Sequence, residues 1–319
     1  MTVPSGLERQ ERWARVAWSF LAEPKEPGLT SLLTEVGAVE ALARLRAGRL
    51  SLRPGPQSRL PDLDLDDLAH AADRQGVQVL VPGDDGWPQG VDRLEDPPYA
   101  LFVRGDADLA ALVDRGVAIV GSRAATEYGI RVAADLAEGL AVRGWTVISG
   151  AAYGIDSAAH RAALATGGAT VAVLACGADR HYPAAHRGLL DEIARTAAVV
   201  SEVPGGAAPY RTRFLSRNRI IATLARATVV VEASFRSGSL STAREARDHH
   251  LPVGVVPGPV TSAASAGCHR LIRETDAVLV TDAAEVAELA ARIGEDLLPG
   301  LDEVRPPREP EDDLDPLAY

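Results

Sequence analysis

The spacing of apolar residues divides the chain into a helical part and a part in which strands alternate with helices. Between residues 7 and 76, apolar residues recur three and four positions apart in W-A-R-V-A-W-S-F-L-A and S-L-L-T-E-V-G-A-V-E-A-L-A-R-L-R, with glycine or proline breaks between the runs. This period is typical of amphipathic helices. We therefore predict a small all-α domain over residues 1–76.

The turn Val36-Gly37-Ala38 in this domain has two interpretations. Two short helices joined through a glycine form the helix-hairpin-helix that binds nucleic acid in other proteins. The same pattern arises from plain helix packing, because a loop glycine needs only a backbone angle that other residues avoid. We favour plain packing, since a single glycine is weak support for the hairpin.

From Val77 the pattern changes to short apolar runs of about five residues. They are V-Q-V-L-V, A-L-F-V-R, G-V-A-I-V-G, W-T-V-I-S-G, A-T-V-A-V-L-A, A-A-V-V-S-E, A-T-V-V-V-E-A, L-P-V-G-V-V-P-G and D-A-V-L-V-T. Most are separated by segments with a helical period. This alternation predicts an α/β domain over residues 77–294, with a doubly wound and mostly parallel sheet. Such sheets bind ligands at the carboxyl ends of their strands.

The acidic balance of the chain is uneven. The formal net charge is −11, but residues 302–319 hold seven acids against two arginines. Residues 86–301 hold 24 acids and 21 arginines, so the overall acidity does not exclude a basic surface for nucleic acid. The proline-rich acidic segment at residues 295–319 predicts a disordered tail.

Several classes of protein have no support in the sequence. No segment carries the eighteen or more apolar residues of a membrane span, and the first residues do not resemble a signal peptide, so we expect a cytoplasmic protein. Cys176 and Cys268 lack metal-ligand spacing and are expected to be buried thiols. We expect neither a metal nor a cofactor.

The segment R-T-R-F-L-S-R-N-R-I-I, residues 211–221, reverses the local sign of the charge. Four arginines and one aromatic residue stand within nine positions without an acid, which indicates a surface for a polyanion. The alternative is a helix whose arginines pair with scattered carboxylates, which is common for an isolated basic run. The other parts of the sequence favour the polyanion.

Two further segments have residues suited to anions at the ends of predicted strands. Gly121-Ser122-Arg123 precedes a helix, and Ser237-Gly238-Ser239 opens another. Free amides and the helix dipole attract an anion at such positions. The first segment lacks the G-x-G-x-x-G spacing of a dinucleotide site. Together with the basic run, three elements suited to anions are predicted at one edge of the sheet.

Ser149, Asp156 and His160 form a conceivable catalytic triad near the second core strand. No G-x-S-x-G elbow accompanies them, and they come from a single strand and helix instead of separate elements. We therefore expect these residues to orient the loop at Gly150 rather than to carry out nucleophilic catalysis.

Eight motifs now identify a resemblance to a known family. They are V-G-S-R-x-x-T-x-Y-G, S-G-x-A-x-G-I-D-x-x-A-H, G-x-D-x-x-Y-P, S-E-x-P-x-G, R-N-R-I-I-A, V-V-E-A, S-G-S-L-x-T-A and V-P-G, in this order between Gly105 and Thr281. The chain strongly resembles the DNA-processing protein A family, DprA or Smf. The resemblance implies an extended Rossmann domain that binds single-stranded DNA, usually as a dimer, and helps to load the RecA recombinase during natural transformation.

The resemblance also implies site residues. It assigns a phosphate-binding turn to Gly121, Ser122 and Arg123, a second-strand loop to Gly150, and a DNA-contacting segment to Phe214, Arg217, Asn218 and Arg219. Arginines hold phosphates and an aromatic ring stacks on a base in such sites. The basic run adds Arg211 and Arg213 to this prediction, and the helix start adds Ser237, Gly238 and Ser239.

The chain departs from the family pattern at a few positions: Leu215, Thr223, His186, His269 and Thr275-Asp276. The arginines are intact, so these departures concern the local backbone shape. The winged-helix domain that often follows in this family is not expected, since only the acidic tail follows residue 294. Nothing in the sequence marks the dimer interface, although the segment Leu251–Leu279 is a candidate.

Three functions remain open from the sequence. The first is a recombination mediator without a catalytic step. The second is an enzyme that resembles the lysine-decarboxylase-like nucleotide phosphoribohydrolases, since Glu245 stands near the place of their acid; their P-G-G-x-G-T-x-x-E motif is absent. The third is a structural protein with an inactive pocket. We expect the first.

Overall fold

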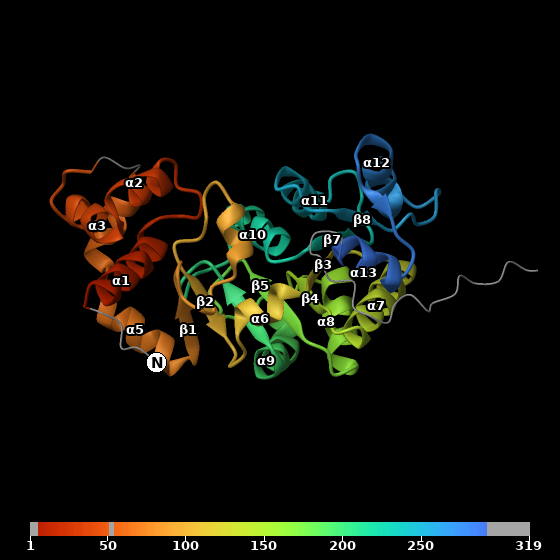
Figure 1. Cartoon of the computed structure of the whole chain (residues 1–319), viewed down its shortest axis with the longest axis horizontal. Coiled ribbons are helices and arrows are strands. Elements are labelled where there is room, and N and C mark those ends of the chain that lie inside the picture. Colours follow the sequence, from red (N-terminus) through yellow and green to blue (C-terminus); the bar gives the residue numbers. More distant parts are fainter. Residues whose placement is uncertain (1–5, 51–53, 292–319) are drawn as a thin grey trace, which may run out of the picture.

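The computed structural model describes residues 6–50 and 54–291. The predicted tail at residues 295–319, the last residues of the predicted α/β domain and the first five residues lie outside this range. In the part described, an α/β sheet is flanked on one side by a group of helices (Figure 1). None of the helices in these ranges has the length and apolar character needed to span a membrane.

The amino-terminal group has five α-helices in the described residues: α1 (Gly6–Leu21), α2 (Leu29–Val36), α3 (Ala38–Arg46), α4 (Pro54–Arg59) and α5 (Leu65–Arg74). Their apolar faces enclose a core around Trp18, Leu29 and Leu45. Tyr99 from the α/β part also packs into this core. The helical group is therefore packed directly against the rest of the chain.

The glycine turn between α2 and α3 is explained by packing. Gly37 has φ +79°, which favours glycine. The carboxylate of Glu11 accepts hydrogen bonds from the amides of Ala38 at 3.2 Å and Val39 at 3.4 Å. A side chain of the protein therefore occupies the amides that a phosphate would need in a helix-hairpin-helix.

Within residues 6–50 and 54–291, the sheet has nine strands in the order β1-β2-β6-β5-β4-β3-β7-β8-β9. They are β1 (Val77–Leu80), β2 (Leu101–Arg104), β3 (Gly116–Val120), β4 (Thr146–Ser149), β5 (Thr170–Leu174), β6 (Ala198–Ser201), β7 (Ala227–Val230), β8 (Val253–Val255) and β9 (Val278–Leu279). The seven strands from β3 to β9 are parallel, while β2 is antiparallel to both β1 and β6. Every predicted apolar run forms one of these strands.

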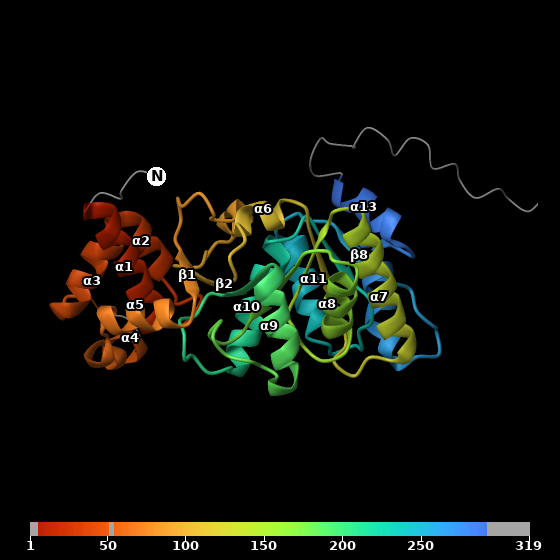
Figure 2. The same cartoon turned by 90° about the horizontal axis from the view of Figure 1, so that it is seen from below.

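Helices cover both faces of the sheet, as a doubly wound fold requires (Figures 1 and 2). The helices of this part are α6 (Leu109–Asp114), α7 (Glu127–Val142), α8 (Ile155–Ala165), α9 (Arg187–Thr196), α10 (Arg211–Thr223), α11 (Ser239–Asp248), α12 (Ala266–Glu274) and α13 (Ala283–Ala291). Along β3, Ala118 and Val120 face the core under α6, α10, α11 and α12, whereas Val117 and Ile119 face the core with α7, α8 and α13. The predicted fold class is confirmed.

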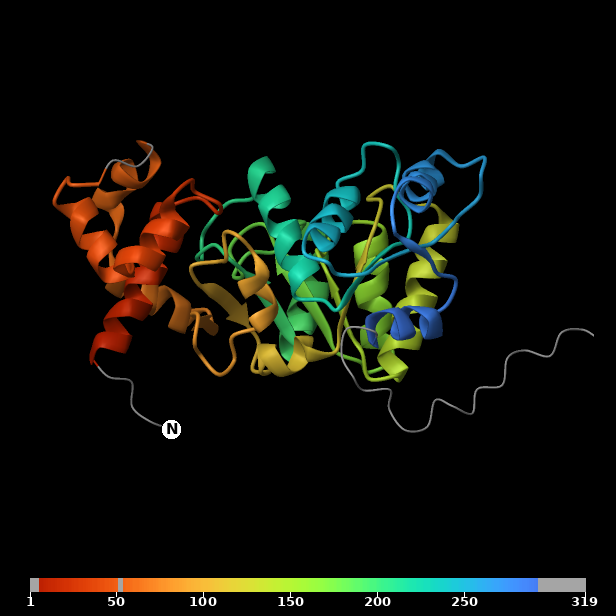
Figure 3. The same cartoon turned by 45° about the horizontal axis from the view of Figure 1, so that its top comes forward.

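The winding of the sheet changes direction at β3. From β3 the chain adds β4, β5 and β6 on one side, and β7 then returns to the other side of β3. The crossovers after β3 and β7 therefore diverge and leave a crevice at the carboxyl ends of these strands. Figure 3 shows α10 and α11 side by side above this part of the sheet.

Candidate nucleic-acid interface

A groove of about 390 Å³ lies at the carboxyl ends of β3 and β7. We call it the central groove. Its lining comes from the β3–α7, β4–α8 and β7–α11 loops and from α10: Val120, Gly121, Ser122, Arg123, Ala124, Ala152, Asp156, Phe214, Leu215, Arg217, Asn218, Ile221, Ser234, Ser237, Gly238, Ser239 and Thr242. Three segments that the sequence predicts to be suited to anions therefore share one cavity.

The turn after β3 is held by close backbone packing. A Cβ atom on Gly121 would lie 2.5 Å from Cγ1 of Ile155 and 3.0 Å from the carbonyl oxygen of Glu232, so only glycine fits there. Arg123 is exposed, and its guanidinium carbon lies 5.1 Å from the centre of the Phe214 ring. A cation over an aromatic face is attracted by it, so the turn presents a positioned charge beside a ring.

The amino end of α7 does not offer free amides to an anion, which corrects part of the prediction. The carboxylate of Glu232 is buried and accepts hydrogen bonds from the Thr126 amide at 2.9 Å and the Thr126 hydroxyl at 2.5 Å. The same hydroxyl accepts a hydrogen bond from the Gly129 amide. Glu232 thus already complements the dipole of α7, and the turn contributes through Arg123.

A second buried carboxylate fills the loop after β4. Asp156 accepts hydrogen bonds from the amides of Gly150 and Ala152, both at 3.2 Å. The guanidinium of Arg217 lies beneath this loop, and its Nη1 donates to the carbonyl oxygen of Val173 at 2.6 Å. Burial raises the pKa of the Asp156 carboxyl, and the positive charge of Arg217 opposes that rise.

Arg217 is a buried cation in the wall of the groove. Only 5% of the residue is exposed, and burial lowers its pKa to about 10, with Asp156 acting in the opposite direction. The side chain therefore remains charged near neutral pH. A Cβ atom on Gly150 would lie 1.9 Å from its Nη1, so the absence of a side chain at Gly150 makes room for the guanidinium.

A smaller pocket of about 50 Å³ adjoins the central groove, with three aromatic rings in its lining. We call it the aromatic pocket. The ring centres of Tyr182 and Phe214 are 5.6 Å apart, and Tyr153 packs edge-on against His186 at 4.7 Å. Tyr153 and Tyr182 are 48% and 41% exposed. Exposed rings beside an arginine are suited to stack on nucleobases.

The start of α11 differs from that of α7, because no carboxylate fills it in the described part of the chain; the Ser237 hydroxyl accepts a long hydrogen bond from the Ser239 amide, at 3.4 Å. Gly238 is the N-cap residue, and the hydroxyls of Ser237 and Ser239 lie 2.7 Å apart. Asn218 fixes this turn by donating to the Gly238 carbonyl oxygen at 3.3 Å and the Ser241 hydroxyl at 2.9 Å. The positive end of the α11 dipole faces the groove and is suited to a phosphate.

The four arginines of α10 do not share one surface. Arg211 is exposed at the first turn, and Arg213 donates from Nε and Nη2 to Glu23, both at 2.8 Å. Arg219 is 2% exposed; it forms an ion pair with buried Glu202 and donates to the Asp96 carbonyl oxygen at 2.7 Å.

The prediction that Arg219 contacts DNA is therefore corrected, because its guanidinium is enclosed away from the groove. Arg213 does not line the central groove either, since a carboxylate of the helical group holds it. For Arg213 and Arg219, the interpretation of arginines paired with scattered carboxylates is the right one. Arg217 lines the groove and Arg211 is exposed at the surface.

The conceivable triad is not assembled. The Ser149 hydroxyl is buried and donates to the Ile119 carbonyl oxygen at 2.6 Å, while Asp156 holds the loop amides. Nδ1 of His160 lies 2.7 Å from the Thr170 hydroxyl, and burial lowers the pKa of this histidine to about 3. The three side chains have separate partners: Asp156 holds the loop at Gly150 as predicted, whereas Ser149 and His160 bind the neighbouring strands instead.

Comparisons with known proteins show the family of this chain. The family model described as DNA recombination-mediator protein A matches residues 78–291, from β1 to the end of α13. The chain belongs to this family. Membership gives this DprA family member a role in DNA processing and recombination. The start of the matched region nearly coincides with the predicted start of the α/β domain.

Relatives of known sequence match most of the chain. A Mycobacterium tuberculosis protein that carries the name DNA processing protein DprA is 47% identical over 308 residues, which are 91% of this chain and 78% of the relative. DprA of Streptococcus pneumoniae is 41% identical over 203 residues, 64% of this chain and 71% of that protein. The similarity to the first relative therefore extends into the helical group.

Two solved structures resemble the fold closely. The X-ray structure of DprA from Streptococcus pneumoniae has a TM-score of 0.74 at 32% identity and covers 90% of this chain and 98% of that one. DNA processing protein A from Helicobacter pylori, described by its single-stranded DNA binding mode, has a TM-score of 0.60 at 29% identity and covers 69% of this chain and 98% of that one.

Several residues that shape the site were not predicted from the sequence. Tyr153 and Tyr182 lie within the family motifs, and an aromatic residue beside a loop glycine or proline at a strand end is the signal that could have identified them. The sequence marks His186 only as a departure, yet its Nδ1 lies 2.9 Å from the carbonyl oxygen of Ala151 and supports the loop after β4. Glu232 has no predicted role.

The contact between Glu23 and Arg213 predicts a pH dependence of stability. Burial raises the pKa of Glu23, but its hydrogen bonds and charge interactions with Arg213 and Arg59 outweigh this and hold it below the ordinary value of 4.5. A carboxyl whose pKa is lowered by folding stabilises the protein. This contribution is fully present above pH 4.5 and is lost as the pH falls through the pKa of the folded protein. In urea unfolding, the free energy of unfolding should thus fall more on acidification for the wild type than for Glu23→Gln.

The matched control for this prediction is Glu40→Gln, because Glu40 forms an exposed ion pair with Arg44 one helical turn away. Exposed pairs of this kind contribute little to stability. The control should therefore follow the wild type. An acid-induced loss in Glu23→Gln as large as that in the wild type would contradict the assigned role of Glu23.

Proposed function

We propose that this protein binds single-stranded DNA in the central groove, performs no catalytic step on it, and helps to load RecA onto it. The observation that carries the proposal is the meeting of Arg123, Arg217 and the start of α11, which no carboxylate fills in the described residues, in one cavity beside the aromatic pocket. Cations and a helix dipole attract phosphates, and exposed rings stack on bases without sequence preference. A cytoplasmic location follows from the RecA partner.

Single strands are favoured over duplexes by the rings. The rings of Tyr153, Tyr182 and Phe214 can stack only on bases that are not already stacked within a double helix. The Helicobacter pylori protein of similar fold is described as binding single-stranded DNA, which supports the same ligand here. The double strand would present mainly its phosphates to this groove.

Fluorescence anisotropy of a labelled oligo-dT and of its duplex counterpart across a salt series tests the proposal. With three or four phosphate contacts, the log-log slope of affinity against salt should be roughly −2 to −3 for the single strand. The duplex should bind more weakly. Absence of single-strand binding would contradict the proposal, and release of free base from nucleoside monophosphates would favour the nucleotide-hydrolase alternative.

Loading of RecA has a separate test. The protein should shorten the lag of RecA filament formation on single strands that are already covered by a single-stranded-DNA-binding protein. Arg123→Ala should lose this effect in proportion to its loss of DNA affinity. An unchanged lag with the wild type would remove RecA loading from the proposal and leave DNA binding in place.

We also propose that the protein is a homodimer joined through the segment Leu251–Leu279. The strand β9 forms an open edge of the sheet, and its residues Val278 and Leu279 are 42% and 46% exposed. Val260 is 88% exposed in the same segment. An exposed apolar sheet edge is prone to pair with another chain.

Light scattering at micromolar concentration should show a dimer for the wild type and a monomer for Leu279→Arg, because a charge on the apolar edge disfavours its burial. Val142→Arg is the matched control, since Val142 is 73% exposed on α7, outside the proposed segment. A monomeric wild type, or a dimeric Leu279→Arg, would exclude this interface.

A further inference from the structure

A second phenylalanine–arginine pair is formed between the loop after β7 and α12. Phe235 is 57% exposed, and the guanidinium carbon of Arg270 lies 5.8 Å from the centre of its ring. The chain has four phenylalanines, and Phe102 is buried while Phe20 packs against the helical core. Phe214 and Phe235 are the remaining two, and each lies beside an arginine.

The loop that carries Phe235 packs closely against α12. The amide of Gly267 donates to the carbonyl oxygen of Ala233 at 2.7 Å. A Cβ atom on Gly267 would lie 2.7 Å from the carbonyl oxygens of both Ala233 and Ser234, so the helix approaches the loop as closely as a glycine allows. Arg270 lies on the same helix. The exposed ring and its cation are therefore positioned by backbone packing and need little ordering on binding.

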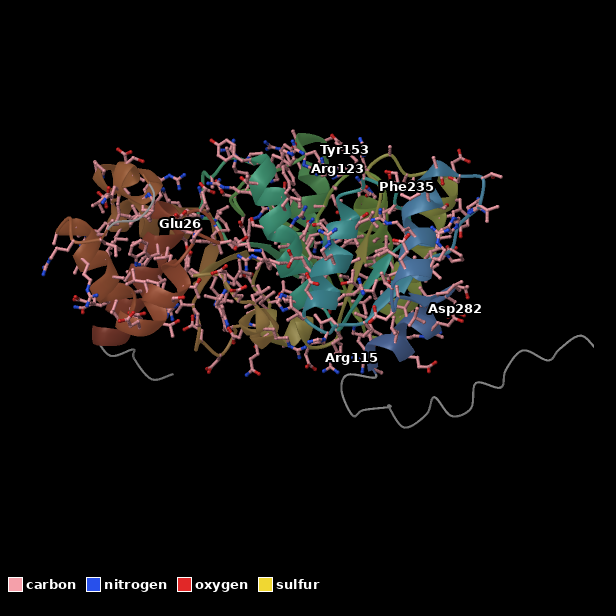
Figure 4. All side chains as sticks on the ribbon, turned by 90° about the horizontal axis from the view of Figure 1, so that it is seen from above. Glu26, Arg115, Arg123, Tyr153, Phe235 and Asp282 are labelled. Carbon is pink, nitrogen blue, oxygen red and sulfur yellow. The ribbon has the colours of Figure 1, made fainter. Side chains whose placement is uncertain are left out.

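The Phe235 pair is continuous with the central groove. Ser234 and Ser237 both line the groove, and the two exposed residues between them are Phe235 and Arg236. Figure 4 shows Arg123, Tyr153 and Phe235 in the half of the molecule opposite Arg115, which precedes β3. The start of α11 follows directly along the chain from this loop. A strand leaving the groove past α11 therefore meets Phe235.

We propose that Phe235 and Arg270 form a second base-stacking site for single-stranded DNA. A strand that stacks one base near Phe214 would place a phosphate at the start of α11 and a later base on Phe235. This inference rests on the proposed function and extends it, because it assigns a longer path and a second anchor to the ligand. Stacking on an exposed ring is tolerant of sequence, so the site would take any base.

Binding measured against strand length tests the second site. Oligo-dT of about 4 nucleotides should occupy one anchor, whereas about 16 nucleotides should reach both. Phe235→Ala should lower the affinity for the longer strand by about 5-fold to 100-fold and change the affinity for the shorter one by no more than about 2-fold. Phe214→Ala should weaken both lengths, and Phe235→Trp should retain tight binding because indole also stacks.

Two controls separate stacking from charge and from assembly. Arg270→Ala should weaken the longer strand more than Arg273→Ala, which removes the same charge from the same helix at a side chain that is 74% exposed. Light scattering should show the same oligomeric state for Phe235→Ala and the wild type.

Equal effects of Phe235→Ala on both lengths, or no effect, would overturn the second site. A change of oligomeric state in that variant would overturn it too, by assigning the ring to a protein interface. These outcomes all leave strong DNA binding by the wild type. Failure of the wild type to bind strands of either length would instead overturn the proposed function, and the second site with it.

Discussion

Replacing Arg219 by alanine is expected to lower the free energy of unfolding by about 3–5 kcal/mol, because it leaves the buried carboxylate of Glu202 without its partner. Arg219 and Glu202 are 2% and 8% exposed, and the Arg219 guanidinium also donates to the Asp96 carbonyl oxygen. Thermal or urea unfolding measures the loss. DNA affinity of the folded fraction should remain close to that of the wild type, since Arg219 is enclosed away from the groove.

The pH sets the size of this effect. Burial already raises the pKa of Glu202, with Arg219 opposing it, so the pKa rises further in the variant. When the pKa of a carboxyl is higher in the folded than in the unfolded protein, the folded protein is most stable below the unfolded pKa. It becomes less stable as the pH rises through the folded pKa. The deficit of Arg219→Ala should therefore be larger at pH 8 than at pH 5. The double variant Arg219→Met, Glu202→Gln should recover much of it.

A variant that unfolds normally but binds DNA poorly would contradict this account of Arg219. It would mean that the arginine reaches the ligand in solution, as the sequence alone suggested. The comparison with Arg123→Ala makes the distinction clear, because that exposed arginine should affect DNA binding and leave the unfolding transition unchanged.

Gly150→Ala is expected to weaken single-stranded DNA binding by about 10-fold or more, through displacement of the Arg217 guanidinium. The added Cβ atom would lie 1.9 Å from Nη1 of Arg217 and 2.6 Å from its Cζ. The guanidinium is buried and tied to the Val173 carbonyl oxygen, so it must leave that position. Crowding of this kind also costs about 1–3 kcal/mol of stability.

Gly188→Ala is the matched control for this effect. Gly188 lies in α9, and an added Cβ atom there meets nothing within 4 Å. Gly188 is the second residue of α9, so its replacement should change the free energy of unfolding by less than about 1 kcal/mol and leave DNA binding unchanged. If Gly150→Ala bound DNA as tightly as the wild type, Arg217 would not be part of the binding surface.

The fold was predictable from the sequence because each strand is a short apolar run and each long helix has its own period. A run such as G-V-A-I-V-G is buried on both faces of the sheet, so its identity as β3 depends only on local composition. The antiparallel pairing of β2 with β6 was not predictable in this way. Residues Phe102 and Ser201 are neighbours across that pair, and their contact joins distant segments.

The location of the site was predictable, but the partners of its charges were not. The basic run on α10 is visible in the sequence, whereas Glu23 lies 190 positions away from Arg213 and is brought to it only by packing of the helical group. Similarly, the sequence shows that a helix starts after Arg123. It does not show that the carboxylate of Glu232 accepts the hydrogen bond of the Thr126 amide at this start. In each case a carboxylate that is distant in the sequence binds the group, the Arg213 guanidinium or the Thr126 amide, that would otherwise be available to a ligand.

The most direct test of the central groove compares the salt dependence of oligo-dT binding for the wild type, Arg123→Ala and Arg143→Ala. Arg143 is an exposed arginine at the end of α7, away from the groove, and its replacement removes the same charge. Arg123→Ala should bind more weakly and with a slope shallower by about 0.7, as expected for one lost contact with a single strand, while Arg143→Ala should follow the wild type. Equal losses in both variants, or in neither, would contradict a DNA site in the central groove.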